Sequence, residues 1–183
     1  MTTKSYFIAT KTVTNEVWQK PQINIDAAHY NGQRFFNPWE REERNQAALL
    51  KWILTRQSQT WPRWCQNETF SVPTERYSQD LNEWKMWFVG HATVLLQIGQ
   101  YNFLTDPVWA ERCSPFKYAG PKRVRGAGIA LEDLPPIDAI LLSHNHYDHL
   151  DTASLLWLHK HHQTPIITGL GNGVYLEQYG FKV

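Results

Sequence analysis

The sequence predicts an α/β protein built around a mixed β-sheet, and three observations lead to that expectation. Two runs rich in β-branched and aliphatic or aromatic residues, 93–98 and 101–105, flank Gly99-Gln100, which is the pattern of an antiparallel hairpin. A nearly continuous apolar run at 137–143 is typical of a strand buried on both faces. Helical and extended patterns then alternate, as they do where helices pack on a partly parallel sheet.

The first elements follow in chain order. Residues 1–38 contain repeated turn signals and predict an irregular arm. Residues 39–58 predict a helix, because acidic residues occupy the first turns and apolar residues then recur at helical spacing. Residues 84–89 predict an aromatic-rich strand that joins the hairpin. The stretch 106–136 contains five Pro and three Gly, which indicates a long loop of a functional type.

The remaining elements lie after the buried run. Asp151 is a candidate N-cap for a helix that continues to about His162. A further buried strand is expected over 165–168, followed by a short helix over 173–179 with Gly180 as its C′ residue. The domain interpretation is therefore an irregular arm over 1–38 and one folded unit over 39–183.

Composition excludes several classes of protein. Of 183 residues, 42% are hydrophobic and 19% charged, which indicates a globular chain. The net charge of +1 gives no electrostatic case for binding nucleic acid. A spanning apolar segment and a secretory signal are both absent from the sequence, and two cysteines cannot form a disulfide framework, so we expect a cytoplasmic protein. The nine tryptophans fit either core and cleft walls, which composition favours, or a peripheral contact with a membrane surface.

Residues 143–151, Ser-His-Asn-His-Tyr-Asp-His-Leu-Asp, carry the chemistry of this sequence. They follow the buried strand directly, where α/β sheets place ligand sites. In extended chain His144 and His146 point the same way and can face one metal ion, while Asp148 and His149 can reach a second ion beside it. Imidazole and carboxylate ligands favour zinc first. Two such ions together favour hydrolysis of a phosphoryl or carbonyl group.

The motif His-x-His-x-Asp-His resembles the signature of the metallo-β-lactamase superfamily. Other blocks narrow the resemblance to its N-acylphosphatidylethanolamine-hydrolysing phospholipase D group. They are Gly90-His91-Ala92-Thr93, Leu104-Thr105-Asp106-Pro107, Gly120-Pro121-Lys122-Arg123 and 134–139, which runs on into 143–151. In order, the resemblance covers about residues 29–183.

The resemblance implies an αββα sandwich with a dinuclear zinc site. By position, His144 and His146 bind the first ion, and Asp148 and His149 bind the second. Asp106 would support the ligands from behind, so that Asp148 and Asp106 are the expected catalytic residues. Tyr147 is implied at the substrate's acyl-amide group. The implied reaction is hydrolysis of a phosphodiester or phospholipid-like substrate by a hydroxide that bridges the two ions.

The sequence departs from the family's pattern in one large respect. The family's site takes three more ligands from its C-terminal half, whereas no Asp or His follows His162 here. We therefore expect the chain to represent the N-terminal half of the αββα fold, with a mixed sheet. Two alternatives stay open: a non-catalytic remnant that binds metal weakly or self-associates through an unfinished sheet, and a lactonase of the same superfamily.

Several other residues have two interpretations. His91 either lines the site or holds a turn between strands, and a single histidine beside Gly90 favours the structural role. Lys122, Arg123 and Arg125 either neutralise a phosphate or form a solvated loop face. Basic residues at 159–162 are expected to form a solvated helix end that complements the helix dipole.

Overall fold

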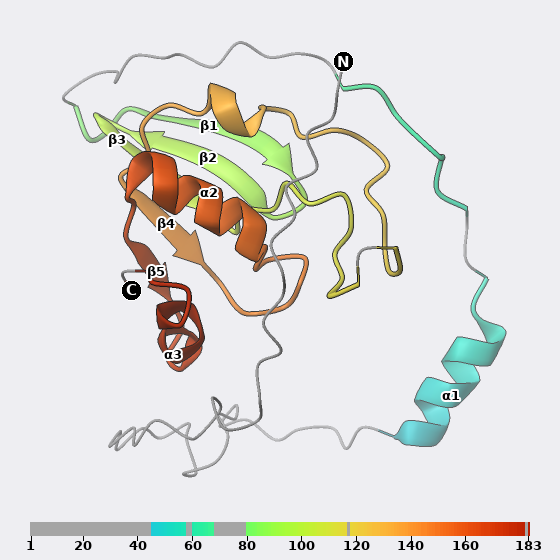
Figure 1. Ribbon diagram of the computed structural model, residues 1–183. Coiled ribbons are helices and arrows are strands. Elements are labelled where there is room, and N and C mark those ends of the chain that lie inside the picture. Colours follow the sequence, from blue (N-terminus) through green and yellow to red (C-terminus); the bar gives the residue numbers. More distant parts are fainter. Residues whose placement is uncertain (1–44, 58–59, 68–79, 117, 182) are drawn as a thin grey trace.

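The structure is a computed structural model, and it describes residues 45–57, 60–67, 80–116, 118–181 and 183 (Figure 1). The predicted arm over 1–38 and the acidic start of the predicted helix over 39–58 lie outside the described residues. Among the helices of the described part, none has both the length and the apolar character needed to cross a bilayer.

Five strands form one mixed sheet in the order β1-β2-β3-β4-β5, which confirms the predicted fold class. The strands β1 (Trp84–Gly90), β2 (Thr93–Ile98) and β3 (Tyr101–Thr105) form an antiparallel meander. The strands β4 (Ala139–Leu142) and β5 (Ile166–Thr168) continue the sheet in parallel to β3. The predicted strands are therefore all present, with 137–143 and 165–168 trimmed to their hydrogen-bonded centres.

Side-chain hydrogen bonds cap the N-termini of helices α1 and α2. Helix α1 (Gln46–Thr55) starts after Asn45, whose side chain accepts hydrogen bonds from two backbone N–H groups of the first turn. Helix α2 (Thr152–His162) starts after Asp151, as predicted. A short 3-10 turn, η2 (Leu131–Asp133), lies inside the long loop. Helix α3 (Asn172–Glu177) ends two residues before the predicted limit, because the chain turns over 178–180.

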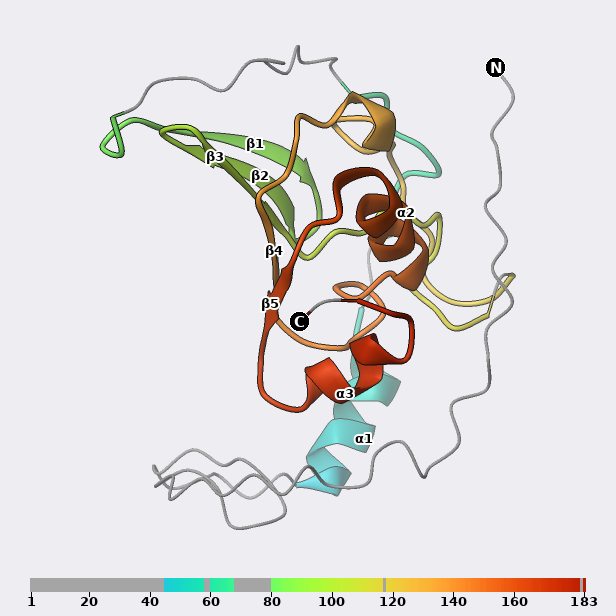
Figure 2. The same cartoon turned by 60° about the vertical axis from the view of Figure 1, so that its left-hand side comes forward.

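One face of the sheet is covered by α2 and forms the core (Figures 1 and 2). Leu95, Leu104 and Ile140 project from neighbouring strands onto that face and are at most 1% exposed. Leu155 and Leu158, on the inner side of α2, belong to the same buried cluster. Burying a side chain of this size contributes about 1.5–3 kcal/mol, so this layer is the main source of stability.

The opposite face of the sheet carries apolar side chains that stay exposed in the described structure. Its register aligns Met86 with Leu96 and Leu96 with Phe103 across β1, β2 and β3. On β1 Trp84 is 65% exposed and Met86 63%, and on β5 Ile167 is 58% exposed. We call this the open sheet face. The described sheet thus has one face covered by a helix and one face with exposed apolar side chains.

The carboxyl ends of β3 and β4 place polar residues at one edge of the sheet. Asp106 directly follows β3, and Ser143 directly follows β4. The Asp106 N–H donates to the Leu141 carbonyl, and Asp106 adopts a φ of 34°, which turns its side chain out of the strand direction. The chain after Ser143 then tightens into a turn, because the His146 carbonyl accepts from the N–H groups of His149 and Leu150.

Candidate metal centre

The predicted histidines of the turn after β4 converge in the structure. The ring centroids of His144 and His146 are 4.5 Å apart, and those of His144 and His149 are 4.0 Å apart. The tight turn at 146–150 produces this convergence, because it folds His149 back onto the start of the motif. Imidazole is a ligand type suited to a borderline divalent ion.

Asp148 lies between two imidazoles. Its Oδ2 is 3.0 Å from Nε2 of His91 and 3.6 Å from Nε2 of His149. Donor atoms of these three residues all lie within 4.8 Å of one another, so they form a group that could hold one ion. His91 comes from the turn between β1 and β2, and its side chain faces the centre although the sequence favoured a structural role for it.

The Asp106 carboxylate is hydrogen-bonded to Ser143 at the start of the turn and to the imidazole of His149. Its Oδ1 accepts from the Ser143 N–H at 2.7 Å, and its Oδ2 accepts from the Ser143 hydroxyl at 2.8 Å. The same Oδ2 lies 2.8 Å from Nδ1 of His149. Because an ionised carboxylate only accepts hydrogen bonds, Nδ1 of His149 must carry the proton of this contact. The proton on Nδ1 leaves Nε2 of His149 as a lone-pair donor toward Asp148, as in histidines that bind metals.

The electrostatics of the centre favour an ionised carboxylate. Burial raises the pKa of Asp148, but its backbone N–H, the His91 hydrogen bond and the nearby His149 outweigh burial, so the pKa lies below its ordinary value. A lowered folded-state pKa means that the stabilising contacts of Asp148 are present above the unfolded pKa. They are lost as the pH falls through the folded value. Asp148 is therefore available as an anionic ligand at neutral pH.

The long loop after β3 is hydrogen-bonded to Asp151, the residue that precedes α2. Asp151 Oδ1 caps α2 through the Ala153 N–H at 3.1 Å, while its Oδ2 accepts from the Ser154 hydroxyl at 2.6 Å. Oδ2 also accepts from the backbone N–H groups of Trp109 and Ala110, at 3.2 and 2.9 Å. One carboxylate thus joins the loop to the element that follows the metal-binding turn. The sequence predicted its capping role and missed its contact with the loop.

Replacing Asp151 by alanine is expected to lower the free energy of unfolding by about 2 kcal/mol. The change removes a helix N-cap and leaves the Ala110 N–H group without its acceptor, while the Trp109 N–H keeps the Ser154 hydroxyl. Urea unfolding followed by tryptophan fluorescence measures the loss. Asp133→Ala, at an exposed carboxylate, is the matched control and should change stability by less than about 0.5 kcal/mol. Equal stability of the two variants would contradict a stabilising role for the hydrogen bonds of Asp151.

The basic residues of the loop are largely occupied in holding it. Arg123 is half-buried, and its guanidinium donates to the carbonyls of Val108 and Ala110. Burial lowers the pKa of Arg123, which nevertheless remains a cation at neutral pH. Lys122 pairs with Glu111. These contacts assign Arg123 a structural role in the loop that neither sequence interpretation included.

Tyr147, the predicted substrate contact, is 54% exposed within the turn. Tyr179 lies near it, and burial, with Tyr175 and Tyr147 nearby, raises the pKa of Tyr179 to about 12. Tyr147 therefore lies in the motif turn with about half of its surface exposed to solvent. Its role in binding substrate stays a prediction.

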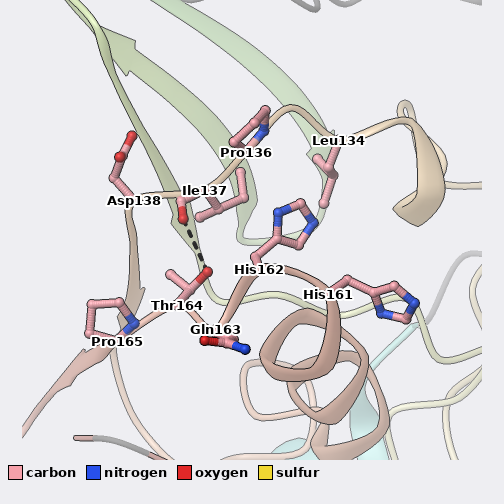
Figure 3. Close-up of a pocket in the computed structure, with 9 residues that line it drawn as sticks. All are labelled: Leu134, Pro136, Ile137, Asp138, His161, His162, Gln163, Thr164 and Pro165. Carbon is pink, nitrogen blue, oxygen red and sulfur yellow. Dashed lines mark hydrogen bonds between the residues drawn. The ribbon is translucent and has the colours of Figure 1, made fainter.

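The histidines at the end of α2 lie away from this centre. His161 and His162 line a pocket with residues that precede β4 and β5, at the edge of the sheet opposite the metal-binding turn (Figure 3). Thr164 closes part of it by donating to the Ile137 carbonyl at 3.0 Å. The expectation of a uniformly solvated helix end is only partly met. Lys160 and His161 are exposed, whereas His159 and His162 are half-buried against the body of the protein.

Comparisons with known proteins agree with the motif. Residues 101–182 match the family model described as "Beta-lactamase superfamily domain". An uncharacterized protein of Mycobacterium tuberculosis is 45% identical over 94 residues, which are 51% of this chain and 25% of that protein. N-acyl-phosphatidylethanolamine-hydrolyzing phospholipase D 1 of Caenorhabditis elegans is 55% identical over 64 residues, 35% of this chain and 18% of that enzyme.

Among solved structures, the chain is similar to the isothiocyanate hydrolase from Delia radicum gut bacteria. It is 30% identical, and the match covers 52% of this chain and 38% of that chain with a TM-score of 0.40. The chain spans a quarter or less of the length of the curated relatives named above. The predicted resemblance to the metallo-β-lactamase superfamily is thus confirmed by the family match, and the likeness to the phospholipase D group is partial.

Proposed function

We propose that this chain, whose residues 101–182 carry the β-lactamase superfamily match, forms the metal-binding half of a zinc-dependent hydrolase that cleaves phosphodiesters. One observation carries the proposal. The imidazoles of His144, His146 and His149 converge with the Asp148 carboxylate at the carboxyl edge of the sheet, and Asp106 supports them from behind. A buried carboxylate that fixes the tautomer of a histidine at such an edge is the arrangement expected of a metal site.

The donor chemistry fits a pair of divalent ions. His144 and His146 would hold one ion, and Asp148 and His149 the other. Two bound ions would supply Lewis acidity at a phosphoryl oxygen and lower the pKa of water toward neutrality. Asp106 keeps the proton on Nδ1 of His149, so that Nε2 stays available. Asp148, with its lowered pKa, contributes negative charge to the site at neutral pH.

The substrate class comes from the partial likeness to the worm enzyme, whose name states that it hydrolyses N-acyl-phosphatidylethanolamine. Tyr147 is exposed beside the centre and would contact the acyl-amide part of such a molecule. A phospholipid substrate requires contact with a membrane surface. Exposed Trp52, Trp61 and Trp64, with Lys51, Arg56 and Arg63 in the same stretch of sequence, support a peripheral contact of this kind.

The open sheet face favours a second candidate function, in which the chain binds metal weakly and acts through self-association. Exposed apolar patches beyond about 300–600 Å² are unusual on monomers and mark interaction surfaces. Trp84 and Met86 on β1 and Ile167 on β5, at the two edges of the sheet, are exposed apolar side chains on this face. This candidate needs no catalysis, and it therefore predicts a different result in the following experiment.

Metal analysis separates the two candidates. The chain is loaded with zinc, passed through dilute chelator and assayed for bound zinc, for cleavage of bis(p-nitrophenyl) phosphate and of a lactone, and for sedimentation. The proposed hydrolase predicts about two retained ions per chain and phosphodiester cleavage that exceeds lactone cleavage. Zinc that is removed by dilute chelator, together with dimers or larger species, would favour the second candidate. Lactone cleavage alone would favour a lactonase.

A further inference from the structure

We propose that helix α1 and the segment over 60–67 dock on a membrane surface that carries anionic lipids. We call residues 45–57 and 60–67 together the docking segment. The inference deepens the peripheral contact of the proposed function, because it assigns that contact to one part of the chain and to one class of lipid. It rests on the proposed function only for its purpose, since docking itself requires neither metal nor catalysis.

The apolar side chains of α1 are exposed to solvent. The helix lies apart from the sheet, and none of its residues is buried (Figure 1). Leu49 and Leu50 are each 57% exposed, Trp52 is 56% exposed and Leu54 is 76% exposed. Removal of these side chains from water provides a driving force for docking on an apolar surface.

Cations are interleaved with the apolar side chains of the docking segment, and their charge selects the occupant. Between positions 45 and 67 the sequence contains Lys51, Arg56 and Arg63 but neither Asp nor Glu. The ion pairs among the described residues include none of these three cations. Burying them against an apolar protein surface, such as the open sheet face of a second copy, would be costly. An anionic bilayer accommodates them, because their charged ends stay at the headgroups while apolar side chains enter the membrane.

Two further tryptophans lie where the docking segment is hydrogen-bonded to the long loop after β3. Trp61 is 80% exposed and Trp64 is 58% exposed. The Cys65 N–H and the Asn67 side-chain amide donate to carbonyls of that loop, at 2.6 and 2.5 Å. Tryptophan is enriched at membrane–water interfaces, where its ring is apolar and its N–H stays hydrated. These hydrogen bonds therefore attach an exposed aromatic pair to the body of the protein.

The test is flotation of the whole chain with vesicles of two compositions. One kind of vesicle contains phosphatidylcholine alone, and the other contains phosphatidylcholine mixed with phosphatidylglycerol. We expect the partition coefficient for the anionic vesicles to exceed that for the neutral vesicles at least about ten-fold, because three cations approach the charged surface. The difference should shrink as the salt concentration rises, since salt screens the attraction.

Paired variants locate the docking surface. Lys51→Gln should lower partitioning to anionic vesicles about five-fold, whereas Lys160→Gln, at an exposed lysine of α2, is the matched control and should leave it unchanged. Trp61→Ser should lower partitioning at least about five-fold. Its matched control is Trp84→Ser, which removes a tryptophan that is 65% exposed on β1. Circular dichroism checks that each variant is folded.

The outcomes separate this proposal from the proposed function. Equal partitioning to the two kinds of vesicle, or none to either, would overturn the docking proposal even if the chain cleaves a phosphodiester. Equal losses in Trp61→Ser and Trp84→Ser would also overturn it, because exposed apolar side chains in general would then explain binding. Self-association without lipid that Trp61→Ser abolishes would show a protein occupant and overturn it as well. Docking as expected, without any phosphodiester cleavage, would support docking and contradict the proposed hydrolase.

Discussion

Asp106→Ala is expected to lower both the stability of the protein and its affinity for zinc. The Asp106 carboxylate is almost fully buried and accepts from the Ser143 N–H, the Ser143 hydroxyl and His149. Removing it leaves buried donors without an acceptor, which costs about 3 kcal/mol. It also frees His149 to rotate and to change tautomer, and the loss of such a supporting group weakens metal binding about 10–100-fold.

A second variant separates these two effects of Asp106. Asp106→Asn keeps an oxygen that can accept from the Ser143 N–H, and asparagine tolerates the positive φ at this position. It carries no charge to hold the proton on His149. We expect Asp106→Asn to retain most of the stability in urea unfolding and to show most of the loss in zinc affinity by competition titration. Wild-type zinc affinity in both variants would contradict the supporting role of Asp106.

His146→Ala is expected to abolish the phosphodiester hydrolysis proposed for this protein. His146 is exposed at the tip of the turn, and its ring packs against His144 rather than into the core. Its removal takes one of the two motif ligands from the first ion, so at least about a 100-fold loss of kcat/KM should follow. The thermal stability of the metal-free protein should stay unchanged, because no buried contact is removed.

The control for His146→Ala is His161→Ala, which removes an imidazole of similar exposure at the end of α2. Hydrolysis and zinc content of this control should match the wild type. Retained hydrolysis in His146→Ala at the wild-type rate would count against the assignment of the motif to a metal centre. Lost hydrolysis with unchanged zinc content would instead indicate that His146 contacts the substrate.

The strands were predictable from sequence because their signals are local. Gly99-Gln100 marks the hairpin between β2 and β3, and the apolar run around Ala139–Leu142 marks β4, in which three of the four residues are buried. Asp151 marked the start of α2 because capping acts over two or three residues. The end of α3 was placed too late, since its last turn depends on how 178–180 pack and not on Gly180 alone.

The site was predictable only where its residues are neighbours in sequence. The motif at 144–149 brings its imidazoles together through one tight turn. The spacing predicted that His144 and His146 lie close together, but for extended chain rather than for a turn. His91 contacts Asp148 from a different turn, far away in the sequence. The sequence around a single histidine beside a glycine does not indicate which residue it will contact. The contact of Asp151 with Trp109 is equally long-range. Both contacts depend on the order of strands in the sheet.

Among the described residues, the grouped donors His91, Asp148 and His149 lie within one stretch of the chain, and Asp106 lies in the same stretch. During synthesis on the ribosome, this stretch emerges as one continuous segment. A cation bound there would therefore stabilise the folded state, because it links the turn between β1 and β2 to the turn after β4. Cells starved of zinc would then be expected to accumulate less of the folded protein.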